Sequence, residues 1–256
     1  MEEGSHQIKV NLMVEINSFL DPNLRKIINS KKQIAVIPVG SIEQHGPHLP
    51  ISTDSDIVTE ISKEISKKNN FLLLPTFHYG ISHEHAPFFN LSLKETTLQR
   101  ILCDLCFSLF ENKIKTIFII NGHHGNLNAI KNVEKKIRKN LKNKIQVFAF
   151  SYWHYMERDF DHAGFVETSL MLSISKDVKM KLAKKGLITD GMNKQEINNL
   201  GKMASKSFPK VTKNGIWGDP RKATKEDGQK IFREIIDNLE KKCQTCLTGH
   251  DSKFYQ

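Results

Sequence analysis

Residues 36–54 decide the fold of this chain, and they read VIPVGSIEQHGPHLPISTD. The apolar run before Gly40 is typical of a buried strand in a parallel sheet, which is covered on both faces. Glu43, His45 and Asp54 follow directly after it. Such polar groups lose hydration when they approach a core, so they cost folding free energy unless a partner compensates. A divalent metal ion would be such a partner.

Two further segments repeat this pattern. The segment NGHHGN at residues 121–126 follows the apolar run TIFII, and DHAGFVETS at residues 161–169 opens a helical pattern. These segments add His123, His162 and Glu167 as candidate site residues. A mixed set of nitrogen and oxygen ligands suits zinc, manganese or iron better than calcium. The three segments together predict a metal-dependent hydrolase.

Strand and helix patterns alternate through most of the chain, which favours the α/β class. We expect a single-domain, three-layer α/β/α fold whose central sheet is mainly parallel, with ligands at the carboxyl ends of its strands. The expected domain spans residues 13–245, between tails at 1–12 and 246–256. Residues 186–222 are the least regular part, and we expect them to form loops or an edge over the site. The strands are expected at 33–39, 71–74, 116–120 and 145–150, and the helices at 14–28, 56–68, from 96 or 97, 127–141, from 167, and 225–242.

Composition narrows the function classes. The formal net charge is +10, but the lysines are scattered and not interleaved with aromatic residues, so we expect no nucleic-acid partner. No apolar run approaches the roughly 18 residues of a membrane span, and no signal peptide is present, which favours a cytoplasmic protein without a membrane partner. Two Cys-x-x-Cys pairs, at 103/106 and 243/246, leave a second zinc site or a redox pair as an alternative to simple core packing.

The three polar segments, in this order and spacing, resemble the creatininase (creatinine amidohydrolase) family, and the resemblance runs from about residue 30 to about residue 240. It implies an α/β fold, a dinuclear metal centre and hydrolysis of C–N bonds in small amides. By this resemblance Asp54 bridges two divalent ions, zinc with iron or manganese. Glu43 and His123 then complete one metal site, and His45 and Glu167 complete the other. His162 is implied to be the proton shuttle, with Glu167 beside it at the catalytic centre.

The chain also departs from the creatinine-hydrolysing members of the family. These members carry a metal-ligating glutamate two residues after the histidine of the second segment, where this chain has Gly125. Of the two tryptophans that close their pocket, Trp153 matches the first, whereas Arg158 stands at the place of the second. The segment YGISHEH at residues 79–85 resembles a pocket-lining segment and adds Ser82 and His85. We therefore expect the substrate to contact Trp153, Arg158, Ser82 and His85.

These departures favour a formamide substrate over creatinine, because an arginine beside the pocket could bind a phosphate. The favoured activity is deformylation of 2-amino-5-formylamino-6-ribosylaminopyrimidin-4(3H)-one 5'-monophosphate, in riboflavin and deazaflavin synthesis. The alternatives are hydrolysis of creatinine or another cyclic amide, trimming of a peptide as in mycofactocin maturation, and a non-catalytic metal-binding scaffold. The resemblance also implies a homo-oligomer, expected to be a hexamer.

Overall fold

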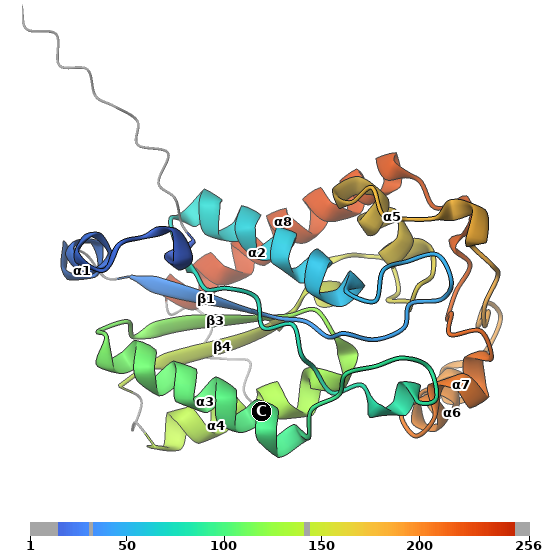
Figure 1. Ribbon diagram of the computed structural model, residues 1–256, viewed down its shortest axis with the longest axis horizontal. Coiled ribbons are helices and arrows are strands. Elements are labelled where there is room, and N and C mark those ends of the chain that lie inside the picture. Colours follow the sequence, from blue (N-terminus) through green and yellow to red (C-terminus); the bar gives the residue numbers. More distant parts are fainter. Residues whose placement is uncertain (1–14, 31–32, 141–143, 249–256) are drawn as a thin grey trace, which may run out of the picture.

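The computed structural model describes residues 15–30, 33–140 and 144–248. Within these residues, parallel strands form one sheet in the order β2-β1-β3-β4. Figure 1 shows helices on both faces of this sheet, so the molecule has three layers. The predicted three-layer α/β/α fold with a parallel sheet is confirmed. The strands are β1 (Ile34–Val39), β2 (Leu72–Leu73), β3 (Thr116–Asn121) and β4 (Gln146–Ser151).

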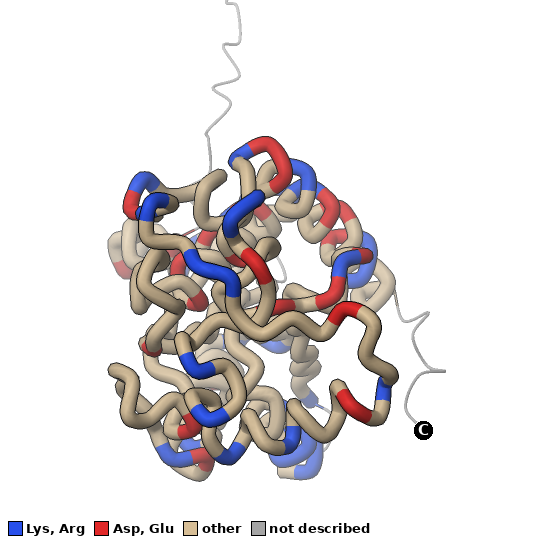
Figure 2. Tube along the Cα trace, turned by 90° about the vertical axis from the view of Figure 1, so that its right-hand side faces the viewer, with Lys and Arg blue, Asp and Glu red and all other residues tan. Residues whose placement is uncertain are grey.

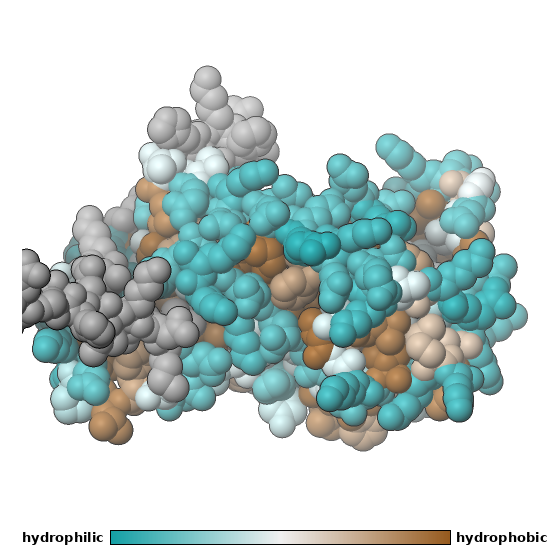
Figure 3. Space-filling view, turned by 90° about the horizontal axis from the view of Figure 1, so that it is seen from above, coloured by the Kyte–Doolittle hydropathy of each residue, from teal (hydrophilic) through white to brown (hydrophobic). Residues whose placement is uncertain are grey.

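The two faces of the sheet belong to two hydrophobic cores, because successive residues of a strand point to opposite sides. Val36 and Phe118 pack with α2 (Thr53–Asn69), α5 (Phe165–Ile174) and α8 (Lys225–Thr248). Ile37 and Ile119 pack with α3 (Glu95–Glu111) and α4 (Leu127–Asn140) on the other side. Seen from above, the outer surface of the α2 and α8 layer is mostly hydrophilic, as expected for amphipathic helices over a core (Figure 3).

The N-terminal helix is shorter than its sequence pattern predicts. A 3₁₀ turn at Ile16–Ser18 precedes α1, which spans Asp21–Ser30. Pro22 lies in the first turn of α1, where its missing N–H costs no hydrogen bond. The expected tail at residues 1–12 lies outside the described residues. The remaining short 3₁₀ elements are η2 (His83–His85), η3 (His124–Asn126), η4 (Tyr152–Tyr155), η5 (Met180–Leu182) and η6 (Pro220–Lys222).

The prediction of loops over residues 186–222 was wrong in part. This stretch contains α6 (Lys194–Ala204) and α7 (Phe208–Thr212). A capping box starts α6, because the Asn193 side chain accepts from the Glu196 backbone N–H and the Glu196 carboxylate accepts from that of Asn193. Figure 1 shows both helices near the carboxyl ends of the strands, below the loops that follow the strands. The stretch is therefore more regular than expected, although it does lie beside the site.

The two Cys-x-x-Cys pairs lie on opposite faces of the sheet. Cys103 and Cys106 are buried in the core under α3, whereas Cys243 and Cys246 are buried in the core under α8. The pairs therefore cannot share one zinc ion. The last helix continues to Thr248, past the expected domain boundary at residue 245. No helix within the described residues is both long and apolar enough to cross a membrane.

Candidate active site

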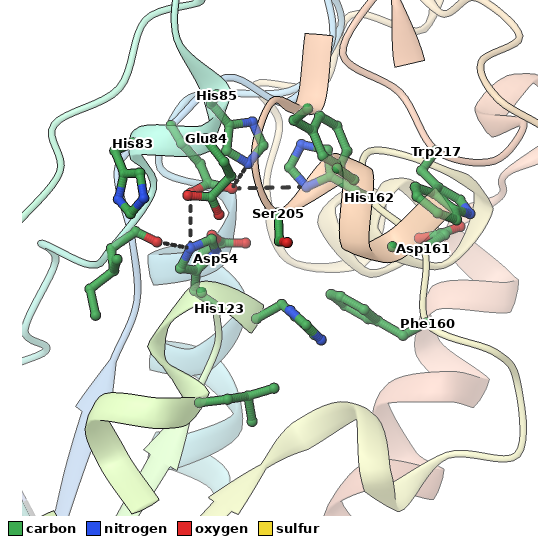
Figure 4. A pocket seen from close by; sticks show the side chains of 18 of the residues that line it. Asp54, His83, Glu84, His85, His123, Phe160, Asp161, His162, Ser205 and Trp217 are labelled. Atoms are coloured by element: carbon green, nitrogen blue, oxygen red, sulfur yellow. Dashed lines mark hydrogen bonds and ion pairs between the residues drawn. The ribbon is translucent and has the colours of Figure 1, made fainter. Parts of the chain in front are cut away.

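The predicted metal ligands meet at the carboxyl ends of β1 and β3. Glu43 and His45 follow β1, His123 follows β3, and Asp54 and Glu167 lie in the first turns of α2 and α5. Each of these five residues is at most 4% exposed. Figure 4 shows Asp54 and His123 side by side in the wall of a cavity.

Backbone carbonyls fix the orientation of the two histidine rings. Nδ1 of His45 lies 3.0 Å from the backbone oxygen of Glu43, and Nε2 of His123 lies 2.8 Å from that of Ile81. A carbonyl oxygen only accepts hydrogen bonds, so each of these nitrogens must donate. The other nitrogen of each ring then faces Asp54, at 3.1 Å for His45 and 3.0 Å for His123. Anchoring one ring nitrogen in this way is typical of histidines that bind metal through the other.

Asp54 connects two groups of potential ligands. Its Oδ1 faces His45, whose Nε2 also lies 3.6 Å from Glu167 Oε2. Its Oδ2 faces His123, whose Nε2 lies 3.2 Å from Glu43 Oε2. In each group of three residues the ligand atoms lie within 4.8 Å of one another. The structure thus brings together the five residues that the sequence singled out. Two of the possible ligand groups share Asp54, and a third joins Glu43, His45 and His162.

A small-residue turn after β3 makes this convergence sterically feasible. A Cβ atom on Gly122 would lie only 2.5 Å from the backbone oxygen of Asp54, so the absence of a side chain lets the start of α2 approach the strand end. The Asn126 amide then joins the neighbouring segments, donating to Gly40 O at 3.0 Å and accepting from the Ile81 N–H at 3.0 Å. The NGHHGN segment therefore positions the site through its backbone as well as through His123.

Burial and charge act against each other in this cluster. Burial raises the pKa of Glu43 to about 8 and raises the pKa of Glu167 well above its ordinary value. Burial would also raise the pKa of Asp54, but the neighbouring His45 and His123 hold it far below its usual range. Although burial alone would lower them, nearby carboxylates raise the pKa values of both histidines to about 10. Without a cation, protons must therefore compensate the buried carboxylates.

The residues present fit a pair of divalent ions. Two imidazole nitrogens and three carboxylates form the mixed donor set that zinc, manganese and iron prefer. Oε1 of Glu167 is buried and has no hydrogen-bond partner among the described residues, which a native structure rarely leaves unexplained. Bound cations would compensate these carboxylates without protonating them.

His162 lies beside this cluster and is held by Gln44. Its Nε2 lies 3.0 Å from the backbone oxygen of Gln44 and must donate to it, so Nδ1 faces the centre, 3.9 Å from Glu43 Oε1. The Gln44 amide also donates to Nδ1 of His85 at 2.9 Å. Nε2 of His85 therefore carries the proton, 3.2 Å from Glu43 Oε1. Burial, together with His45, lowers the pKa of His162 well below its ordinary value, which favours a neutral imidazole.

A cavity of about 640 Å³ opens over the cluster. Of the expected substrate contacts, His85 lines it, whereas Ser82 is buried and does not. Trp153 is buried behind the wall and stacks on Phe160, with ring centroids 4.7 Å apart. Arg158 is exposed, with its guanidinium 4.9 Å from the ring centroid of Phe165, and does not line the cavity.

Four large apolar residues of the cavity wall were not singled out by the sequence patterns. They are Phe160, Ile197, Phe208 and Trp217. Trp217 exchanges two backbone hydrogen bonds with His162, at 2.8 and 3.1 Å, which places its ring at the cavity. The signal available in the sequence was a tryptophan between Gly215 and Gly218, in the stretch that was expected to be irregular. In the structure both glycines have positive φ angles.

Comparison with known proteins identifies the family of this chain. The family model Creatininase, described as creatinine amidohydrolase, matches residues 21–243. The mycofactocin precursor peptide peptidase of Mycobacterium ulcerans is 29% identical over 84% of this chain and 86% of its own length. A deformylase of Methanocaldococcus infernus that acts on the formylaminopyrimidine monophosphate is 27% identical over 84% of this chain and 92% of its own. The creatinine amidohydrolase of Pseudomonas putida is 26% identical over 57% and 65%.

Solved structures share the fold. The Zn–Zn type of a mutant creatininase superposes with a TM-score of 0.78 at 20% identity, over 90% of this chain and 96% of that one. A manganese form of creatininase gives a TM-score of 0.76 at 18% identity over the same shares. At these identities the likeness concerns the fold, and the family model carries the assignment, because it matches most of the chain. The chain therefore belongs to the creatininase family of amidohydrolases.

Proposed function

We propose that this protein hydrolyses an amide C–N bond at a pair of divalent metal ions. The observation that carries the proposal is the position of Asp54, whose two oxygens face two differently anchored histidines, each joined by its own glutamate. Glu43, Asp54 and His123 would hold one ion, and His45, Asp54 and Glu167 the other. Such ions supply polarisation of the amide carbonyl and a water of lowered pKa.

His162 is the proton carrier in this proposal. Its lowered pKa favours the neutral form, and its free Nδ1 faces the centre while Nε2 is held by Gln44. A neutral imidazole first accepts a proton at Nδ1 and then passes it to the departing nitrogen. The aromatic rings of Phe208 and His45 lie 4.7 and 4.3 Å from the His162 ring, centroid to centroid, and restrict its motion.

Three substrate classes are consistent with the family, and two features of the cavity support one of them over the others. The formamide ribotide carries a phosphate, but no lysine or arginine is among the described residues that line the cavity, and Arg158 lies outside it. A cavity of about 640 Å³ with an aromatic wall also suits a group larger than the small creatinine ring. We therefore propose a linear amide, such as a short peptide or an aminoacyl amide, ahead of the phosphorylated formamide.

Metal analysis tests the metal pair directly. Protein purified without a histidine tag should contain about two transition-metal ions per chain, and Asp54→Ala should lose both ions and the hydrolysis of amide probes. The matched control is Asp56→Ala, because Asp56 lies in the same helical turn but accepts from Ser52 and belongs to neither ligand group. Wild-type protein without stoichiometric metal after reconstitution would overturn the proposal.

A second experiment separates the phosphorylated formamide from the linear amide. If the ribotide were the substrate, the phosphorylated compound should be hydrolysed much faster than its dephosphorylated form, and Arg158→Ala should remove this preference. We expect no such preference. A preference of tenfold or more that depends on Arg158 would restore the deformylase hypothesis.

We also propose that the protein forms a homo-oligomer. Ile51, Phe89 and Leu91 are 44%, 56% and 45% exposed. They lie on neighbouring stretches, because residues 42–44 hydrogen-bond to Ile51 on one side and to Phe89 and Leu91 on the other. Exposed apolar groups that lie together favour an interface. Size-exclusion chromatography with light scattering should show a multimer, expected to be a hexamer, and Phe89→Ser should weaken it; a monomer at micromolar concentration would contradict this.

A further inference from the structure

The cavity has an unusual charge composition for so basic a chain. The sequence contains 38 lysines and arginines, yet none of the described residues that line the cavity is one of them. The lining does include carboxylates that belong to neither ligand group, namely Glu84, Glu95 and Asp161. Apart from the proposed metal ions, any charged part of a substrate therefore meets acids and histidines, and no lysine or arginine.

Two of these three carboxylates are already engaged. Asp161 accepts from the backbone N–H groups of Val166 and Glu167, at 2.8 and 3.2 Å, and so caps the start of α5. Glu95 accepts from the side-chain amides of Gln99 and Asn132, at 2.9 and 3.3 Å. These contacts hold both groups in place and satisfy part of their hydrogen-bonding capacity.

Glu84 differs from both, because its carboxylate makes no hydrogen bond or ion pair within the described residues. It lies in η2 between His83 and His85, and Figure 4 shows it at the cavity beside His85 and the metal-ligand cluster. The backbone at Gly125 makes room for it. A Cβ atom there would lie 3.2 Å from Glu84 Oε1 and 2.5 Å from His123 Nε2, so the carboxylate and the imidazole approach each other across the glycine.

We infer that the cavity selects amides that carry a cationic nitrogen near the scissile bond, and that Glu84 is the specificity-determining residue that receives this nitrogen. The inference rests on the proposed hydrolysis. No lysine or arginine among the described residues of the cavity pairs with Glu84, so its carboxylate is free to bind a cationic group of the substrate. A cationic group in the half-buried position next to Glu84 forms a charge-assisted hydrogen bond with it, whereas Glu84 repels an anionic group.

The aromatic wall suggests suitable probes. Phe160 and Trp217 offer an apolar surface for an aromatic leaving group. The p-nitroanilides of β-alanine, N-acetyl-β-alanine and N-succinyl-β-alanine share the scissile anilide and differ in carrying a cationic, neutral or anionic end. We expect kcat/KM to fall in this order, with about a tenfold or larger advantage of the cationic over the neutral probe, as for a hydrogen bond between charged groups.

Glu84→Gln keeps the size of the side chain and removes its charge. We expect it to abolish the preference for the cationic probe, mainly through a higher KM for that probe, while the metal content stays within about twofold. Glu84→Asp should restore part of the preference. The matched control is Glu111→Gln, an exposed glutamate at the end of α3, which should leave the order of the three probes unchanged.

Three results would overturn the inference. The first is equal treatment of the three probes by the wild-type protein. The second is an intact preference in Glu84→Gln, and the third is an equal fall of all three rates in that variant together with loss of metal. The last result would place Glu84 in the metal centre instead. If no probe is hydrolysed, calorimetric titration of the zinc-loaded protein with the same compounds decides. If the cationic probe binds more tightly than the others and this difference depends on Glu84, the inference holds although the proposed hydrolysis fails. Equal binding of the three probes would overturn the inference.

Discussion

Residues 176–213 form part of the cavity wall, and their two sides differ in character. Toward the cavity they present Ile197, Ala204 and Phe208, whereas Lys206 and Lys210 are exposed. Residues 176–213 contain ten lysines and only three carboxylates, so the segment as a whole is strongly basic. Figure 2 looks onto this end of the molecule and shows lysines and arginines spread over its surface.

This difference teaches that the charge of a chain, or of a segment, does not give the charge of the cavity it encloses. A positive net charge favours a phosphorylated substrate only if cations reach the site. Here the lysines lie outside, and the cavity contains carboxylates and histidines. A lysine side chain is strongly hydrated and is rarely buried without a partner. The lysines of a helix that lies over a cavity therefore face the solvent. Substitutions in the cavity should therefore have large effects on activity, and substitutions on the basic surface small ones.

The largest effect in the cavity is expected for His162→Asn. The amide of asparagine cannot accept and release a proton near neutral pH, so kcat should fall by a factor of about 10² to 10⁴. His162 belongs to neither group around Asp54, but it does form a third possible group with Glu43 and His45. Because we propose that the two groups around Asp54 hold the ions, metal content should stay unchanged. Loss of activity together with loss of metal would instead indicate that His162 is a metal ligand. Single-turnover kinetics and elemental analysis on the same preparation distinguish these results.

Gly125→Ala should have the next largest effect. Its Cβ atom would lie 2.5 Å from His123 Nε2 and even closer to the backbone oxygen of Ile81, a rigid neighbour. The backbone must then shift and move His123, for which we expect about a 10- to 100-fold loss of metal affinity, as for other changes that reorient a ligand. Zinc titration with a chelating indicator measures this loss. Gly191→Ala serves as a comparison, because a Cβ atom there meets nothing within 4 Å, although its positive φ strains any side chain; equal affinities would contradict the steric argument.

The fold and the convergence of the candidate ligands could be predicted from sequence for the same reason. Strands such as β1 and β3 are apolar throughout, and their parallel ends must meet at one edge of the sheet. Candidate ligands placed directly after these strands, such as Glu43 and His123, therefore come together regardless of the conformation of the connecting loops. The family resemblance added the division into two sets around Asp54, which stays a prediction; the structure shows that these residues lie close together.

The cavity wall could not be predicted in this way. Trp217 and Phe208 come from a stretch far along the chain, and which side of α6 and α7 faces the site depends on tertiary packing rather than on local pattern. Arg158 shows the same limit, because its position four residues before His162 says nothing about where a long side chain on a loop points. Gln44 was inside the deciding stretch, but its link to His85 and His162 is visible only in three dimensions.

Removing the metal should make the cavity sensitive to pH. In the metal-free protein the pKa values of His45 and His123 rise from 6.5 to about 10 through nearby carboxylates, against the effect of burial. Between these values the folded protein binds more protons than the unfolded chain, so the free energy of unfolding should fall as the pH rises. We expect a loss of at most about 5 kcal/mol between pH 7 and pH 9, if both histidines titrate fully, in denaturant titrations with a chelator present. The zinc-loaded protein should lack this loss, since ligating histidines are already deprotonated; equal slopes in both forms would contradict the assignment.

The smallest effect is expected on the basic surface, for Lys206→Gln combined with Lys210→Gln. Both side chains are exposed, so stability should change by less than about 0.5 kcal/mol and kcat should stay the same. Their charges act on a substrate only through solvent, where the Debye length is about 8 Å at physiological salt. At low salt, kcat/KM for an anionic probe should therefore be a few-fold lower in the variant than in the wild type, and this difference should disappear once salt is added. Comparing N-succinyl-β-alanine p-nitroanilide at two ionic strengths measures this. A tenfold or larger, salt-insensitive rise in KM would mean that these lysines reach the substrate, and the contrast between the two sides of the segment would not hold.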